Sequence, residues 1–209
     1  MKTIFLIRHA LPDFPQGEAI CMGKKFDLPL SPQGRMQAEE LARLLNGLPI
    51  ERVYSSPARR CLETAAPLAK AKGGEPRVLE AMSELRGGLW DGMTRRQIHE
   101  LYPQYFVPGC ALTPPGGETD EEAWARGLKA LETMLAETHR FCACVTHSSL
   151  MRVLACGLNK RPFGEKRGIL AEHGGILPLE WNGREFSCPT ASLTACELRE
   201  QLEGAKHEG

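Results

Sequence analysis

The apolar stretch Ile4–Ile7, which is followed at once by Arg8 and His9, constrains the fold most strongly. It is short and rich in β-branched residues, which predicts a buried strand of an α/β sheet. It is too short to cross a bilayer or to form the apolar region of a signal peptide. Because ligands of open α/β sheets bind just outside the carboxyl ends of strands, Arg8 and His9 are expected where such a fold does its chemistry.

Strand and helix patterns alternate along the rest of the chain. The predicted elements are a helix opening at Ser31-Pro32, a strand over Arg52–Ser55, a helix opening at Ser56-Pro57, a short strand over Arg77–Leu79, a short helix over Thr94–Leu101, a helix opening in the capping box of Thr119–Glu122, a strand over Phe141–Thr146 and a helix from Ser148 to Cys156. Asn182-Gly183, between two apolar segments, predicts a hairpin. This order predicts an α/β fold with a C-terminal hairpin. Without repeats or linkers, residues 1–202 are expected to form a single domain and residues 203–209 a flexible tail.

Charge and composition narrow the range of partners. Lys plus Arg and Asp plus Glu number 26 each, so the net charge of +0 suggests neither a nucleic-acid nor a membrane partner. With no export signal or long apolar run, we expect a cytoplasmic protein. The eight cysteines are scattered and none forms Cys-x-x-Cys, so reduced core thiols are expected and no metal site.

Three predicted strand-to-helix junctions carry similar polar side chains. The junctions contain Arg8 and His9, then Arg59 and Arg60, then His147 and Ser148. Right-handed crossovers between parallel strands place all three junctions on one edge of the sheet. Helix N-termini and guanidinium groups together form an anion site, which favours phosphate or carboxylate.

Two histidines at such a site indicate more than anion binding. A neutral imidazole can attack phosphorus while surrounding cations stabilise the charge on the phosphoryl oxygens. The leaving group also needs a proton donor, and Glu84 is the best candidate, because it lies near the start of the glycine-rich loop from Met82 to Gly92, which could fold over the pocket.

Several blocks together resemble the histidine phosphatase superfamily, or phosphoglycerate mutase-like fold, over nearly the whole chain. The blocks are Leu-Ile-Arg8-His9-Ala10, Leu30-Ser-Pro-Gln-Gly34 with Gln37-Ala38, Tyr54 to Ala65, Glu84 with Gly88, Trp90 and Gly92, Pro115-Gly-Gly-Glu118, and Val145-Thr-His147. The resemblance implies a three-layer αβα sandwich around a mostly parallel sheet. Two departures are Ala10 and Ser148, each of which stands where the family has glycine.

The resemblance also implies roles for individual residues. His9 would be the nucleophile that forms a phosphohistidine, and Glu84 the proton donor. Arg8, Arg60 and His147 would bind the phosphoryl group, with Ser148 beside them. The spacing Arg-x-x-x-Thr favours Arg60 over Arg59 for this role, which leaves Arg59, with Glu118, as a substrate-binding candidate. No metal and no cofactor are implied.

The sequence therefore predicts a phosphomonoester hydrolase that acts through a phosphohistidine on a small phosphorylated metabolite. Cys21-Met-Gly23, Asp27 and Pro29-Leu-Ser31 look most like the alpha-ribazole phosphatase branch, which makes alpha-ribazole-5'-phosphate one candidate substrate. The alternatives are a phosphoglycerate mutase-type transfer, a non-catalytic module that binds phosphorylated ligands, and a metal-dependent hydrolase. The sequence leaves the oligomeric state open.

Overall fold

A six-stranded sheet forms the centre of the computed structural model, which describes residues 1–23, 25–106 and 113–204. The strands are β1 (Lys2–Arg8), β2 (Arg52–Ser55), β3 (Arg77–Val78), β4 (Phe141–Thr146), β5 (Ile176–Trp181) and β6 (Phe186–Ser187). Their spatial order is β3-β2-β4-β1-β5-β6. The strands from β3 to β1 pair in parallel, whereas β5 pairs antiparallel with both β1 and β6. The predicted sheet and its C-terminal hairpin are confirmed.

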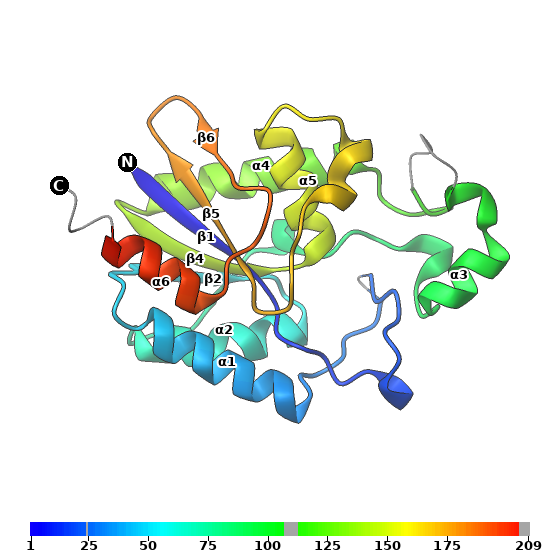
Figure 1. Ribbon diagram of the computed structural model, residues 1–209, viewed down its shortest axis with the longest axis horizontal. Coiled ribbons are helices and arrows are strands. Elements are labelled where there is room, and N and C mark those ends of the chain that lie inside the picture. The colour runs from blue at the N-terminus through cyan, green and yellow to red at the C-terminus, as the bar shows by residue number, and fades with distance from the viewer. Residues whose placement is uncertain (24, 107–112, 205–209) are drawn as a thin grey trace.

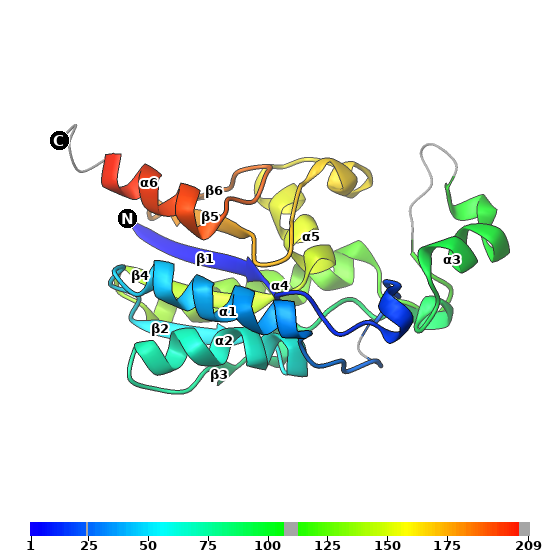
Figure 2. The same cartoon turned by 60° about the horizontal axis from the view of Figure 1, so that its bottom comes forward.

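Helices cover both faces of the sheet and complete the predicted three layers (Figure 1). The helices are α1 (Pro32–Leu45), α2 (Arg59–Ala71), α3 (Arg95–Leu101), α4 (Asp120–Glu137), α5 (Ser148–Leu158) and α6 (Ala195–Gly204). Short 3-10 helices span Pro15–Gly17, Glu80–Met82, Gly88–Trp90, Pro103–Phe106 and Phe163–Gly168. Helices α1, α2 and α6 pack on one face, and α4 and α5 on the other. Figure 2 shows α1 and α2 in front of the sheet, with α3 set apart beyond the strand ends.

Strand β1 lies at the centre of the core, as its apolar sequence predicts. Ile4, Phe5, Leu6 and Ile7 are each at most 1% exposed. Because side chains alternate along a strand, Phe5 and Ile7 pack with α1, α2 and α6, whereas Ile4 and Leu6 pack with α4 and α5. The strand therefore fixes the position of the two residues that follow it.

Of the helix openings predicted at Ser31, Ser56, Thr119 and Ser148, three are confirmed and that at Ser56 is wrong. Ser31 accepts a hydrogen bond from Gly34 N at 3.0 Å, and Thr119 forms the predicted capping box with Glu122. Helix α2 begins at Arg59 rather than at Ser56-Pro57, because the Ser56 hydroxyl is bonded to a histidine ring instead of capping the helix. Helix α5 starts at Ser148, as predicted, and His147 occupies its N-cap position.

The C-terminal region departs from the sequence prediction. Helix α6 was not predicted, and it extends to Gly204, past the point where a flexible tail was expected to begin. Residues 205–209 of that expected tail lie outside the described residues. All cysteines in the described ranges are free thiols. Within these ranges no helix has both the length and the apolar composition needed to cross a bilayer.

Candidate active site

The carboxyl ends of β1, β4 and β2 meet at one edge of the sheet. In the parallel register Arg8 lies opposite Thr146, and Ser55 lies opposite Val145. The residues that follow these strands are therefore brought together. The rings of His9 and His147 contact each other edge to face, with centroids 5.4 Å apart. The predicted convergence of the two histidines is confirmed.

His9 presents its Nε2 atom as a free nucleophile. Its Nδ1 atom lies 2.8 Å from the carbonyl oxygen of Ala10. Because a carbonyl only accepts, Nδ1 carries the proton and the lone pair is on Nε2. Burial, reinforced by the charge of Arg60, holds the pKa of His9 well below its usual range, so the ring is neutral at pH 7. Ala10, in place of glycine, has no positive φ, so the turn is unstrained.

Arg60 and His147 form a buried pair. Arg60 is 1% exposed, and its Nη2 donates to Nδ1 of His147 at 3.1 Å. Nε2 of His147 therefore carries the proton, which it donates to the Ser56 hydroxyl at 2.8 Å. Burial and the charge of Arg60 lower the pKa of His147 well below its usual range. The neutral imidazole of His147 therefore orients Arg60 by accepting this hydrogen bond.

The turn after β1 and the second arginine are linked by Thr64. Its hydroxyl donates to the carbonyl oxygen of Arg60 at 2.7 Å and accepts a hydrogen bond from Ala10 N at 3.0 Å. The carbonyl oxygen of Phe26, at 3.1 Å, accepts a further hydrogen bond from Nη1 of Arg60. These contacts fix Arg60 relative to His9.

Both arginines keep one buried donor without a partner. Nε of Arg8 and Nε of Arg60 are buried and have no hydrogen-bond acceptor among the described residues. Buried polar groups in native proteins are almost always paired, so such a pair of orphaned donors calls for an explanation. Both donors belong to arginines that line the two neighbouring cavities of the site, where an anionic ligand would supply acceptors.

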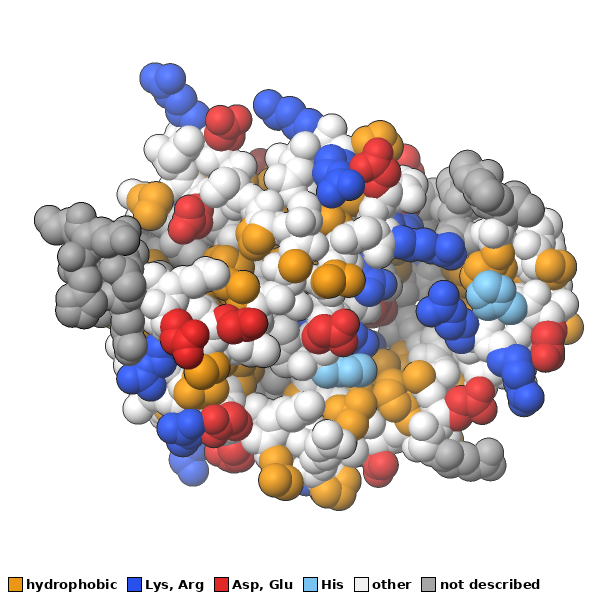
Figure 3. Space-filling model, viewed as in Figure 1, with side chains coloured by type: hydrophobic (Ala, Val, Ile, Leu, Met, Phe, Trp, Pro, Cys, Tyr) orange, Lys and Arg blue, Asp and Glu red, His pale blue; other side chains and the backbone are white. Residues whose placement is uncertain are grey.

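Glu84 and Ser148 line the same cavity as Arg8 and His9. This cavity has a volume of about 320 Å³. A neighbouring cavity of about 250 Å³ is lined by Arg60 and His147, and Glu84 lines both. In the space-filling view, Lys and Arg side chains gather around a hollow between the sheet and the part of the chain that carries α3 (Figure 3). The structure thus brings an acid, two imidazoles and two guanidinium groups to one place.

The two substrate-binding candidates have different surroundings. Glu118 reaches the cavity, but it is 3% exposed and its carboxylate accepts hydrogen bonds from Arg126 at 2.7 and 2.9 Å. Burial acts to raise the pKa of Glu118, but the bonds and charge of Arg126 outweigh it, so the pKa is lowered. Arg59 does not reach the cavity: it is exposed, pairs with Glu63 at 2.6 Å and lines a different surface depression. The structure gives no support for substrate binding by Arg59.

Three residues of the site were missed by the sequence analysis, namely Ser56, Arg126 and His173. Ser56 was assigned to a helix cap. Arg126 lies inside α4, where nothing in its spacing distinguishes it from a solvated helix residue. His173 precedes β5, and the rule that ligands bind at the carboxyl ends of strands does not point to a residue before a strand. Because β5 is antiparallel, its beginning lies at the edge where the parallel strands end. In the described part of the chain no cluster of His, Cys, Asp and Glu side chains is arranged to hold a metal ion.

Comparison with protein families decides the family. Residues 4–194 match the model of the histidine phosphatase superfamily, branch 1. The chain belongs to the histidine phosphatase superfamily. Among curated members, phosphoserine phosphatase 1 of Hydrogenobacter thermophilus is 29% identical over 96% of this chain and 89% of its own. Glucosyl-3-phosphoglycerate phosphatase of Mycobacterium tuberculosis is 28% identical over 86% of this chain and 83% of its own.

Solved structures of other proteins share the fold. YhfR of Bacillus stearothermophilus superposes with a TM-score of 0.81 at 23% identity, covering 90% of this chain and 95% of its own. A phosphoserine phosphatase of Entamoeba histolytica superposes with a TM-score of 0.78 at 22% identity. The family and its members confirm the predicted phosphatase. They support the superfamily but not the alpha-ribazole phosphatase branch in particular.

Proposed function

We propose that this histidine phosphatase hydrolyses small phosphomonoesters through a phosphohistidine on His9. Nε2 of His9 attacks phosphorus and the ester P–O bond breaks, while Glu84 gives its proton to the leaving oxygen. Glu84 then takes a proton from water, whose oxygen attacks phosphorus, and the P–N bond breaks to release phosphate and neutral His9. In both steps Nδ1 of His9 keeps its proton, which is hydrogen-bonded to the carbonyl oxygen of Ala10.

The observation that carries this proposal is the set of donors around the nucleophile. Arg8 and Arg60 each keep an unpaired Nε–H group, and the charges of both act on the neutral imidazole of His9, whose lone pair is on Nε2. Charge that develops on the phosphoryl oxygens is stabilised by donors that are already in place before the reaction. Ser148, at the first turn of α5, adds a helix N-terminus to the same cavity.

The first test is the substitution His9→Ala, assayed with an aryl phosphate. We expect turnover to fall by a factor of about 10³ or more, because the covalent route is closed. Brief mixing of the wild-type protein with a radiolabelled substrate, followed by denaturation, should trap an acid-labile phosphoenzyme that is missing from His9→Ala. Unchanged hydrolysis in the variant would refute the mechanism.

The second test separates hydrolysis from transfer and narrows the substrate. The panel includes phosphoserine, glucosyl-3-phosphoglycerate, alpha-ribazole-5'-phosphate, sugar phosphates and nucleotides, because the curated relatives are named for the first two. We expect release of inorganic phosphate from a small member of the panel, since the cavity of about 320 Å³ suits a small ligand. Persistence of a bisphosphate would favour a mutase, and tight phosphate binding without turnover would favour a binding module. Activity that is lost in chelator would favour a metal-dependent hydrolase.

A further inference from the structure

A third imidazole, that of His173, lies beside the nucleophile. The ring centroids of His9 and His173 are 5.4 Å apart, which equals the distance between the rings of His9 and His147. His173 is also one of the residues that line the cavity shared by Arg8 and His9. Its position is therefore inside the site, although it follows the first histidine by more than 160 residues.

The contact between His173 and Arg8 has a defined direction. Nε2 of His173 lies 2.8 Å from Nη2 of Arg8. A guanidinium group can only donate, so Nε2 accepts, and the proton of the neutral ring is on Nδ1. Burial, followed by the charge of Arg8, lowers the pKa of His173 to about 4, so the ring stays an acceptor at neutral pH.

The segment Ala171–Gly175 encloses Arg8 on several sides. The carbonyl oxygen of Ala171 accepts from Nη1 of Arg8 at 2.7 Å. The carbonyl oxygen of Gly175 accepts from the backbone N–H of Arg8 at 2.9 Å, and Gly174 N donates to the carbonyl oxygen of Arg8 at 3.1 Å. Backbone contacts therefore hold the base of the side chain, while Ala171 and His173 hold both terminal nitrogens of the guanidinium.

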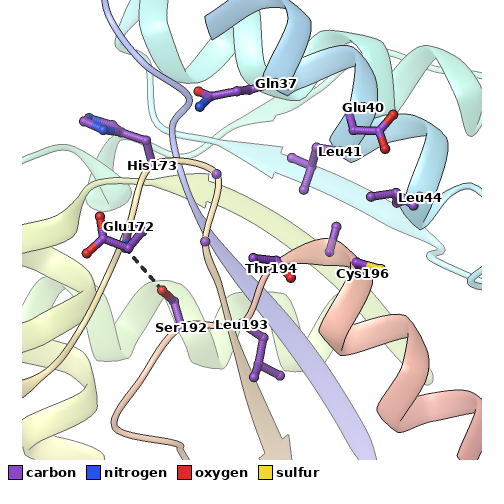
Figure 4. Close-up of a pocket in the computed structure, with 13 residues that line it drawn as sticks. Gln37, Glu40, Leu41, Leu44, Glu172, His173, Ser192, Leu193, Thr194 and Cys196 are labelled. Atoms are coloured by element: carbon purple, nitrogen blue, oxygen red, sulfur yellow. Dashed lines mark hydrogen bonds between the residues drawn. The ribbon is translucent and has the colours of Figure 1, made fainter.

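The segment is itself anchored on the far side. Glu172 N donates to the hydroxyl of Ser192 at 3.2 Å, and the ring of His173 points away from Leu41 and Leu44 (Figure 4). Gly174 has a φ of 73°, which favours glycine and lets the chain turn directly after His173. The imidazole of His173 is thus held beside Arg8 by a turn that is itself hydrogen-bonded to Ser192.

We propose that His173 is a positioning residue for phosphoryl transfer: its Nε2 holds the Arg8 guanidinium in the orientation that binds the phosphoryl group beside His9. This inference rests on the proposed function of the site. A guanidinium that is oriented before the substrate arrives does not have to be ordered by it. Loss of the acceptor should therefore weaken phosphate binding and slow the transfer, without removing any group that reacts.

The test compares two substitutions of equal length. In His173→Gln the amide oxygen can replace Nε2 as acceptor, whereas His173→Met has no strong acceptor. We expect kcat/KM to fall about 10- to 100-fold in His173→Met and to stay within about threefold of wild type in His173→Gln. The inhibition constant of inorganic phosphate should rise in the Met variant only. The control is His139→Met, because His139 is exposed and precedes β4 at the opposite end of the sheet. This variant should match wild type in kcat/KM and in the inhibition constant of phosphate.

A double-mutant cycle with Arg8→Ala separates positioning from a general structural role. If His173 acts through Arg8, His173→Met causes little further loss of kcat/KM in the Arg8→Ala background. Full additivity, or an equal loss in the Gln and Met variants, would overturn the inference. If the His173→Met variant does not fold, His173→Asn is used in its place, because the asparagine side chain is too short for its amide oxygen to reach the position of Nε2.

Calorimetric binding of inorganic phosphate keeps the two proposals distinguishable. A wild-type protein that binds phosphate but does not turn over substrates contradicts the proposed function. Even then, weaker phosphate binding by His173→Met than by His173→Gln would support the role of His173, and equal binding would contradict it.

Discussion

Nδ1 of His147 accepts a hydrogen bond from Nη2 of Arg60 at 3.1 Å, although the two residues are 87 positions apart in the sequence. Ser56, which follows β2, accepts from the other nitrogen of the same ring. Ser56, His147 and Arg60 therefore form one chain of hydrogen bonds, in which every donor and acceptor role is fixed by the guanidinium. The orientation of Arg60 toward a phosphoryl group depends on this chain.

Substitution of Ser56→Ala should break the chain at its end. The N–H of His147 is then buried without its acceptor, which costs about 1–3 kcal/mol of the free energy of unfolding. Because His147 is less firmly held, the inhibition constant of inorganic phosphate should rise as well. Both quantities are measured by urea denaturation and by steady-state inhibition. Ser187→Ala, on exposed β6, is the control, and an equal effect of the two substitutions would contradict the prediction.

The ion pair of Glu118 and Arg126 should matter for both stability and turnover. Nη1 of Arg126 also donates to the carbonyl oxygens of Ala81 and Ser83, at 2.7 and 2.9 Å, directly before the proposed acid Glu84. Arg126→Met leaves the carboxylate of Glu118 buried without its partner, and we expect a loss of about 3–5 kcal/mol in the free energy of unfolding. We also expect kcat to fall more than KM changes, because the loop that carries Glu84 loses its anchor.

The matched controls for this pair lie within the chain. The double variant Glu118→Gln/Arg126→Met should recover part of the lost stability, because the unpaired charge is removed, while kcat stays low. Arg43→Met breaks the exposed pair with Glu40 and should leave stability and kcat unchanged. Recovery of kcat in the double variant would show that the loop is not held by Arg126.

The low pKa values of His9 and His147 predict how stability depends on pH. Both folded-state pKa values lie well below the ordinary value of about 6.5, so below that pH the unfolded chain binds more protons. The free energy of unfolding is therefore highest above about pH 6.5 and falls as the pH decreases. His9→Asn should reduce this slope by up to about 1.4 kcal/mol per pH unit. Urea denaturation of both proteins between pH 5 and pH 8 measures this slope. An unchanged slope in His9→Asn would contradict the lowered pKa of His9.

The sequence was most informative where chemistry follows directly from the backbone. Strand periodicity placed Arg8 and His9 after β1, and the parallel register placed His147 beside them. Arg60 was separated from Arg59 by the spacing of the family block, and the structure agrees, since Arg60 points inward from α2 and Arg59 outward. Whether residues 1–202 fold as an independent domain stays a prediction.

What the sequence did not provide depends on strand direction and on long-range side-chain pairing. The beginning of β5 lies at the edge of the sheet that carries the active site only because β5 runs antiparallel to β1. A sequence pattern does not specify that direction for a strand next to a hairpin. Arg126 and Ser56 gain their roles from partners on other elements, Glu118 and His147, so their local sequence resembles that of an ordinary helix or cap.

The pairing of β1 has a consequence for how the chain is made. Ile4 pairs with Cys142 and Leu179, so β1 precedes both of its neighbours in the sheet by more than 130 positions and has no partner until they have been synthesised. Contacts this distant in sequence slow folding, and the apolar segment of β1 is prone to aggregation until it pairs with β4 and β5. We therefore expect the nascent protein to depend on chaperones, and phosphoryl chemistry to begin only after β4 and β5 have been synthesised and have paired with β1.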